Sequence, residues 1–235
     1  MTEAQWLKSV EPFDMLGYLD GKSTDRKLRL FQAACCRRVW KLLPKKVCRD
    51  AVLIAEKYAD GEVGDKERRA AHALIVGFRP NGALAEKVRG LAARQAGYAA
   101  FYAIDKRVAK HLRLIRASGV SATLAHAARK AAKSQERDPW TKVHKAEQRI
   151  TAHLIRCIFG NPFRPVTIDQ TWKTDTVLSL AKHMYESRDF GAMPILADAL
   201  QDAGCDNDDV LSHCRDAKQV HVRGCWAVDL VLGKE

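Results

Sequence analysis

The sequence lacks any apolar run of the roughly 18 to 20 residues that a membrane-spanning helix needs. Its first residues, MTEAQWLKSVEP, also lack the charged-then-apolar pattern of a signal peptide. We therefore expect a cytoplasmic protein with no membrane partner. The chain has seven cysteines, including the adjacent Cys35 and Cys36, but their spacing is not that of a secreted disulfide framework. We expect reduced thiols that are mostly buried.

Motifs typical of common enzyme classes are also missing. The chain contains no glycine-rich phosphate-binding loop of either common type and no Gly-x-Ser-x-Gly or cysteine-protease signature. His153 and Cys157 lie four positions apart, which would place them on one helix face. They flank an apolar stripe, so we interpret this pair as packing residues. The sequence thus identifies no catalytic residue and favours a protein that is not an enzyme.

No segment alternates apolar and polar residues with the period of two that a half-buried strand requires, whereas spacings of three and four recur along most of the chain. We therefore predict an all-α fold. Because no internal repeat of fixed period is present, an irregular bundle or array of about ten helices is favoured. We expect one helical domain over residues 1–235, with N-terminal helices (1–63), basic central helices (64–160) and acidic C-terminal helices (161–235). Gly160 to Pro165 is the clearest break.

The clearest helical pattern runs from Asp25 to Leu43, and Pro44 ends it because proline cannot continue a helix. At about 100° per residue, the large apolar side chains fall within one half of this helix and the basic ones occupy the opposite arc. The basic residues of that arc are Arg26, Lys27, Arg37, Arg38 and Lys41. We expect this helix to be central, with Phe31 and Trp40 largely buried and the C-terminal helices close to it.

The net charge of +12 is concentrated in the middle of the chain. Residues 61–160 carry 20 basic and 8 acidic side chains, whereas residues 161–235 carry 8 and 12. No acidic residue lies between Lys106 and Gln135. Basic residues of this kind neutralise phosphates and release counterions, which predicts sequence-tolerant, salt-dependent binding of nucleic acid or another polyanion. The candidate binding residues are Lys106, Arg107, Lys110, Arg113, Arg116, Arg129, Lys130, Lys133 and Arg137.

Residue types that ligate metals gather near the C-terminus, at Cys205, His213, Cys214, His221 and Cys225. Thiolates and imidazoles at such separations could form a tetrahedral zinc site, and the glycine before Cys225 would permit a tight turn. Zinc modules usually contain a Cys-x-x-Cys or His-x-x-x-His pair, which this segment lacks. We therefore expect buried thiols, locally bonded histidines and no cofactor. If zinc is bound, Cys205, Cys214, His221 and Cys225 are the candidate ligands.

Both ends of the chain carry patterns of a known family. Residues 5–63 contain WLKSVEPFDML, STDRKLRLFQAACCRRVWKLL and AVLIAEKYADG, and residues 156–235 contain FGNPFRPV, PILADALQDAGC and LSHCRDAKQVHVRGCWAVDLVLGKE. These segments resemble an uncharacterised family of planctomycete bacterial proteins and domains. The resemblance implies a cytosolic context and no established activity, substrate or catalytic residue. It also suggests that the two ends pack together around a variable middle.

The charge pattern favours a non-catalytic helical module that binds nucleic acid or another polyanion through residues 104–137. The alternative is a protein-interaction or scaffold domain whose important surface lies elsewhere, such as the acidic C-terminal third. A third hypothesis is a zinc-binding or enzymatic protein centred on the segment from Cys205 to Cys225.

Overall fold

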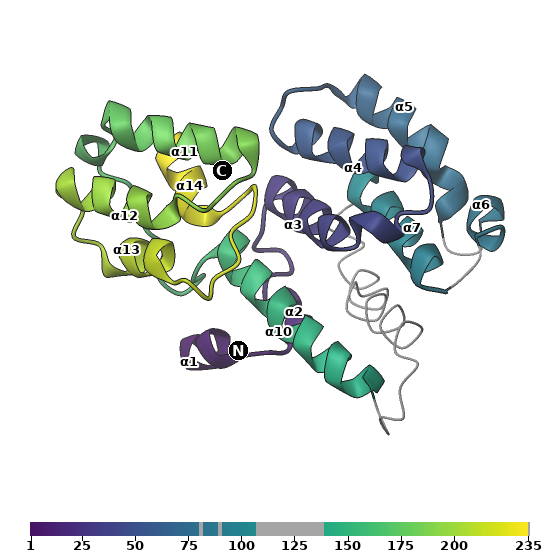
Figure 1. The fold of residues 1–235 in the computed structure, drawn as a ribbon, viewed down its shortest axis with the longest axis horizontal. Helices are drawn as coiled ribbons and strands as arrows, with labels where there is room; N and C mark the ends of the chain where they lie inside the picture. The colour runs from purple at the N-terminus through teal and green to yellow at the C-terminus, as the bar shows by residue number, and fades with distance from the viewer. Residues whose placement is uncertain (80–81, 89–90, 107–138, 235) are drawn as a thin grey trace. The chain divides into compact units, whose positions relative to one another are not determined.

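The computed structural model describes residues 1–79, 82–88, 91–106 and 139–234 (Figure 1). The fold is all-α, as predicted, and these residues form no strand. The chain divides into two compact units, Met1–Ala152 and His153–Glu235. The boundary lies within helix α10 (Pro139–Phe159), before the break predicted at Gly160. Across the described part of the chain, no helix has the length and apolar character required to cross a bilayer.

The first unit contains most of the described helices, and the second contains the last four α-helices. Helix α10 runs from the first unit into the second. The elements of the first unit are α1 (Glu3–Lys8), α2 (Pro12–Tyr18), α3 (Asp25–Arg38), η1 (Trp40–Leu42), α4 (Lys46–Ala59), α5 (Asp65–Ile75), η2 (Val76–Phe78), α6 (Ala83–Glu86) and α7 (Leu91–Ile104). After α10, the second unit has η4 (Gln170–Trp172), α11 (Asp175–Ser187), α12 (Met193–Asp202), α13 (Asp208–Arg215) and α14 (Trp226–Leu232).

Helix α3 is the central element of the first unit. The Thr24 side chain caps it by accepting a hydrogen bond from the backbone N–H of Lys27. Helices α4 and α7 both pack against α3, and every residue from Leu28 to Cys36 is buried. Phe31 is buried as predicted, but Arg29 is buried as well. Because two helices cover α3, its buried surface is wider than the single apolar face that the helical periodicity predicts.

The predicted helix over residues 25–43 ends earlier, at Arg38, and a 3₁₀ turn follows from Trp40 to Leu42. Trp40, which the sequence predicts to be largely buried, is less completely covered than Phe31, because it is partly exposed whereas Phe31 is fully buried. Trp40 lies in this 3₁₀ turn, beyond the end of α3. Its ring lies 5.0 Å from the guanidinium carbon of Arg37, at the edge of the core.

Acidic partners cover much of the predicted basic arc of α3. Arg26 pairs with Asp60 at 2.9 Å, after the end of α4, and Arg37 donates to Glu56 of α4 at 2.6 Å. Arg38 pairs with Glu147 of α10 at 2.6 Å. Three of the five basic residues therefore connect elements of the first unit, and the arc is not simply a solvated surface. The predicted helix pattern is correct here, but the partners come from distant parts of the sequence.

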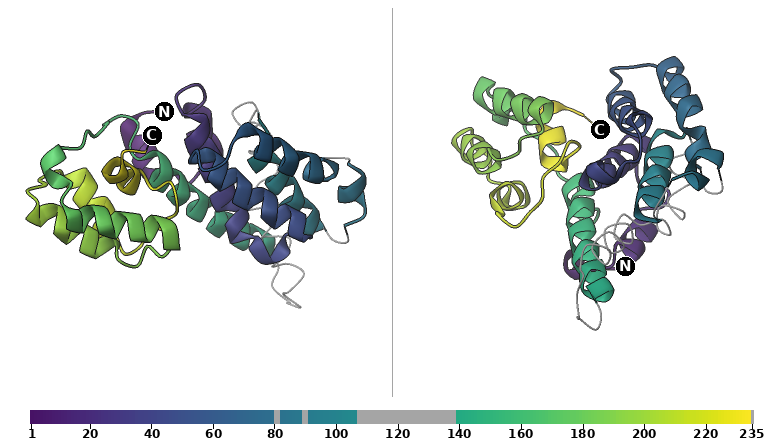
Figure 2. Two further views of the ribbon diagram at one scale, coloured as in Figure 1. Left: turned by 90° about the horizontal axis from the view of Figure 1, so that it is seen from above. Right: turned by 45° about the vertical axis from the view of Figure 1, so that its right-hand side comes forward.

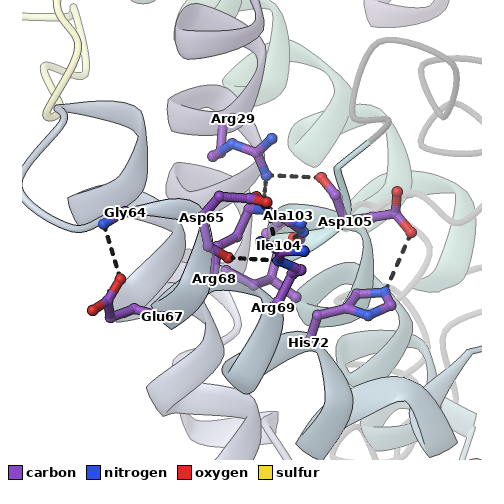
Figure 3. Close-up of polar contacts among 10 residues, drawn as sticks. All are labelled: Arg29, Gly64, Asp65, Glu67, Arg68, Arg69, His72, Ala103, Ile104 and Asp105. Atoms are coloured by element: carbon purple, nitrogen blue, oxygen red, sulfur yellow. Dashed lines mark hydrogen bonds and ion pairs between the residues drawn. The ribbon is translucent and has the colours of Figure 1, made fainter.

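Two buried arginines hold the C-terminal end of α7 (Figure 3). The Nη1 atom of Arg29 donates to the carbonyl oxygens of Ala103, at 2.7 Å, and Asp105, at 2.9 Å. Arg68 of α5 donates to the carbonyl oxygen of Ile104, at 3.1 Å, and also pairs with Asp65. The last carbonyls of a helix have no partner within the helix and carry partial negative charge. The two guanidinium groups satisfy them and fix the point at which α7 ends.

In the second unit, helices α12 and α13 lie side by side in every view (Figures 1 and 2). Arg215 of α13 pairs with Asp198 of α12 at 2.8 Å on their exposed side. The buried side contributes to one apolar core that α11 and α14 complete, and Met184, Leu200 and Val228 are fully buried in it. The end of α10 enters the same core through Cys157.

Candidate metal centre

Four side chains from four elements of the second unit converge on one point. Cys157 lies in the last turns of α10, and His213 lies in the last turn of α13. His221 belongs to the loop that follows α13, and Cys225 is the N-cap residue of α14. Their ligand atoms all lie within 4.8 Å of one another. This arrangement brings together two thiols and two imidazoles, which is a ligand set of known zinc sites.

Two distances within the cluster are close to the edges of a zinc tetrahedron. The Nε2 atom of His213 lies 3.2 Å from the Sγ atom of Cys225, and the Nδ1 atom of His221 lies 3.8 Å from the same sulfur. Zinc binds nitrogen at about 2.0–2.1 Å and sulfur at about 2.3 Å, so neighbouring ligands of one ion lie about 3.3–3.8 Å apart. The remaining ligand atoms lie within 4.8 Å of one another, so they would have to draw closer to bind a single ion.

Local structure positions the two ligands that come from helix ends. Gly160 ends α10 with a φ of 64°, and the chain then turns away, so that Cys157 stays in the final part of the helix. The Asn207 side chain caps α13 by accepting from the N–H of Val210 at 3.1 Å. This cap sets the start of α13, and with it the position of His213 in its last turn.

The loop that carries His221 is attached to α10. The side-chain amide of Gln219 donates to the backbone carbonyl of His153 at 2.9 Å, and its oxygen lies 3.3 Å from the ring of the same histidine. Gly224 adopts a φ of 92°, which a residue with a side chain rarely adopts, and it thereby allows the turn into Cys225. The tight turn predicted at this glycine is present, and it brings His221 back toward Cys225.

The site favours the thiolate form of Cys225. Burial by itself raises the pKa of this thiol, but a hydrogen bond from Cys157 and the charge and hydrogen bond of His213 lower it, as does the hydrogen bond of His221. Together these interactions hold the pKa of Cys225 well below its ordinary value. A thiolate is the form that ligates metals. Both cysteines are fully buried, whereas both histidines are half-buried.

The cluster contains two of the four zinc ligands that the sequence suggested, His221 and Cys225. Cys205 and Cys214 lie in the apolar core instead, and burial raises the pKa of both thiols. They are small buried thiols, as their sequence context predicts. His213 belonged to the C-terminal group noted in the sequence, but Cys157 was interpreted as a packing residue. Nothing in its local spacing indicates that α10 ends beside α14.

The predicted polyanion-binding residues lie almost entirely outside the described residues. Lys106, directly after the end of α7, is exposed. The other eight fall within residues 107–138, outside that part of the chain: Arg107, Lys110, Arg113, Arg116, Arg129, Lys130, Lys133 and Arg137. The structure therefore describes one member of that set and does not test the predicted surface.

No protein-family model matches the chain, and no curated protein or solved structure matches it either. A functional conclusion therefore depends on the chemistry of the Cys157, His213, His221 and Cys225 cluster and on the distribution of charge.

Proposed function

We propose that the second unit is a zinc-binding module in which Cys157, His213, His221 and Cys225 hold one structural Zn²⁺ ion. The observation that carries this proposal is the convergence of four ligand atoms within 4.8 Å of one another. The module contributes a stable, non-catalytic scaffold to the protein. Its ligand set differs from the one that the sequence suggested, because Cys157 and His213 replace Cys205 and Cys214.

The ligand chemistry supports zinc over other metals. Two thiolates and two imidazoles in a tetrahedral arrangement suit Zn²⁺, whereas Mg²⁺ and Ca²⁺ prefer oxygen ligands. Four protein ligands complete the tetrahedron and leave no position for a water molecule or a substrate. Catalytic zinc sites keep such a position open, so a closed set of four ligands favours a structural ion.

The structural role also follows from where the ligands lie. Each comes from a different element, and an ion would join the end of α10, the end of α13, the loop after it and the start of α14. Because the unfolded chain does not hold these ligands together, the free energy of metal binding becomes free energy of folding. An ion at this point would stabilise the arrangement of the whole second unit.

The test is the metal content of the full chain after purification without chelator. We expect elemental analysis to return about one equivalent of zinc. Cys157→Ser and His213→Gln should each lose most of it. Cys205→Ala is the matched control, because Cys205 is also a buried thiol of the same core but lies outside the cluster, and this variant should retain the metal. Metal-free wild type that fails to bind added Zn²⁺ would refute the proposal.

We also propose that the basic segment, residues 104–137, binds nucleic acid or another polyanion. The observation that favours it is the lack of any acidic residue between Lys106 and Gln135, over a stretch with eight basic side chains. Each phosphate contact releases counterions, so the logarithm of the affinity should fall with the logarithm of salt concentration by about 0.7 to 0.9 per contact.

The corresponding test measures binding of the full chain to single-stranded and duplex nucleic acid over a series of salt concentrations. The triple variant Arg107→Glu, Lys110→Glu and Arg113→Glu should bind more weakly and with a shallower salt dependence. Reversing Lys182, Arg188 and Lys218, basic residues of the second unit, is the charge-matched control and should change binding less. If wild type binds none of these molecules at low salt, the polyanion proposal fails and the protein-interaction hypothesis is favoured.

A further inference from the structure

The indole ring of Trp226 lies directly against the backbone of Gly160. A Cβ atom added to Gly160 would lie 3.1 Å from the Cγ atom of Trp226 and 3.2 Å from its Cδ2 atom. Such distances are shorter than ordinary van der Waals contacts. Gly160 also has a φ of 64°, a left-handed conformation that favours glycine. Glycine is therefore favoured at position 160 for two independent reasons: its backbone conformation and the lack of space for a Cβ atom beside Trp226.

The same indole ring lies beside a ligand of the metal centre. Its centroid is 5.1 Å from that of the His213 ring, at an interplanar angle of 50°. The His213 ring in turn meets the His221 ring edge to face, with centroids 4.9 Å apart. The three rings thus form a continuous series of ring contacts that starts at the backbone of Gly160 and ends at the second imidazole ligand.

This series of ring contacts joins elements that carry the ligands. Gly160 follows Cys157 by three residues at the end of α10, and Trp226 directly follows Cys225 at the start of α14. A ring wedged between the end of α10 and His213 restricts rotation of the imidazole. Hydrogen-bonding groups outside the first coordination shell that orient ligating histidines typically contribute 10- to 100-fold to metal affinity, and we take the same range for a ring that restricts the imidazole by packing.

We infer that Trp226 is a positioning residue of the metal centre, seated on Gly160 and holding the His213 ring in the orientation that ligates zinc. This inference rests on the proposed zinc site. Trp226 itself provides no ligand atom, so its effect is indirect. It restricts rotation of the His213 and His221 rings before the ion binds. Metal binding therefore costs these side chains less conformational entropy.

The test compares zinc affinity, measured by competition with a chromophoric chelator, in two glycine variants of the full chain. Gly233 is the matched control, since it ends α14 with a φ of 65° and the nearest atom to an added Cβ is Lys173 Nζ at 3.9 Å. Both Gly160→Ala and Gly233→Ala introduce the same backbone strain. Only Gly160→Ala displaces Trp226, so it should lose about 10- to 100-fold in affinity while Gly233→Ala stays close to wild type.

A second pair of variants keeps the test independent of Gly160. Trp226→Ala should lose affinity to a similar extent, and Trp226→Phe, which retains an aromatic ring, should restore part of it. The absorption spectrum of the Co²⁺-substituted protein gives a readout of ligand geometry, and it should change in Trp226→Ala and Gly160→Ala but not in Gly233→Ala.

The possible outcomes distinguish the positioning role of Trp226 from the proposed zinc module on which it rests. If wild type binds no zinc, the proposed zinc module fails. If wild type binds zinc but Trp226→Ala and Gly160→Ala match its affinity and its Co²⁺ spectrum, the zinc module stands and the positioning role is refuted. Equal losses in Gly160→Ala and Gly233→Ala would also refute it, because backbone strain alone would then explain the effect.

Discussion

The Nε2 atom of His213 lies 3.2 Å from the Sγ atom of Cys225, so the last turn of α13 meets the start of α14 at this pair. The two groups form a hydrogen bond, and both would be ligands of the proposed zinc ion. His213 and Cys225 would therefore connect the two helices with or without zinc, by a hydrogen bond in one case and by shared coordination of the ion in the other.

Zinc should raise the stability of the protein. An ion that binds only the folded state at 100 times its dissociation constant stabilises that state by about 2.7 kcal/mol. We expect the thermal midpoint of the second unit to fall after chelation and to recover when Zn²⁺ is added back, as followed by circular dichroism. Cys157→Ser should show neither response. A wild-type midpoint that is insensitive to both treatments would contradict the prediction.

Removing the guanidinium of Arg29 should destabilise the first unit. Arg29→Met retains the apolar stem but loses two charge-assisted hydrogen bonds, to the carbonyls of Ala103 and Asp105, and leaves both acceptors buried. Such bonds contribute about 1.5–3 kcal/mol each, so we expect a loss of about 3–6 kcal/mol in the free energy of unfolding. Arg69→Met is the control. Its side chain is 72% exposed, so the change in urea denaturation should be small.

Truncating Phe31 should have a comparable effect for a different reason. Its side chain is 1% exposed at the centre of α3, and Phe31→Ala would leave a cavity that costs about 3–5 kcal/mol. Trp40→Ala should cost less, because that ring is only half-buried. Phe13, which is 50% exposed, provides a same-type control whose replacement by Ala should change the urea midpoint little. Equal losses at Phe31 and Phe13 would contradict the described core.

The first unit should lose stability in alkaline solution. Burial raises the pKa of the Cys35 thiol to about 12 and that of Cys48 to about 11, whereas an unperturbed thiol has a pKa of 9.0. The folded protein therefore holds these protons more tightly than the unfolded chain. The stabilising difference is complete below pH 9.0 and is lost as the pH rises through the folded-state values.

Urea unfolding followed at neutral pH and at several values above 9.0 would measure this loss. The variants Cys35→Ala and Cys48→Ala should each show a weaker pH dependence than wild type, even though they also lower stability at neutral pH. A free energy of unfolding that stays constant above pH 9.0 would show that these thiols are not protected by burial.

Local sequence determined the helices well, because caps and stops act over a few residues. Thr24 and Thr174 cap α3 and α11, Gly160 ends α10, and the predicted all-α fold is confirmed. Even there, local patterns were limited. The same periodicity that placed α3 did not reveal the 3₁₀ turn at Trp40, because the end of that helix depends on packing as well as on Pro44.

Tertiary structure alone decided which polar and reactive groups meet. Arg29 had no local feature to indicate that it would bind the end of α7, since its partners at Ala103 and Asp105 lie far along the chain. Cys157 likewise shares no motif with Cys225, and only the folding of α10 against α14 brings the two thiols together. Helix formation depends on neighbouring residues, which the sequence displays directly. A metal centre built from four separate elements depends on long-range packing, which no local spacing encodes.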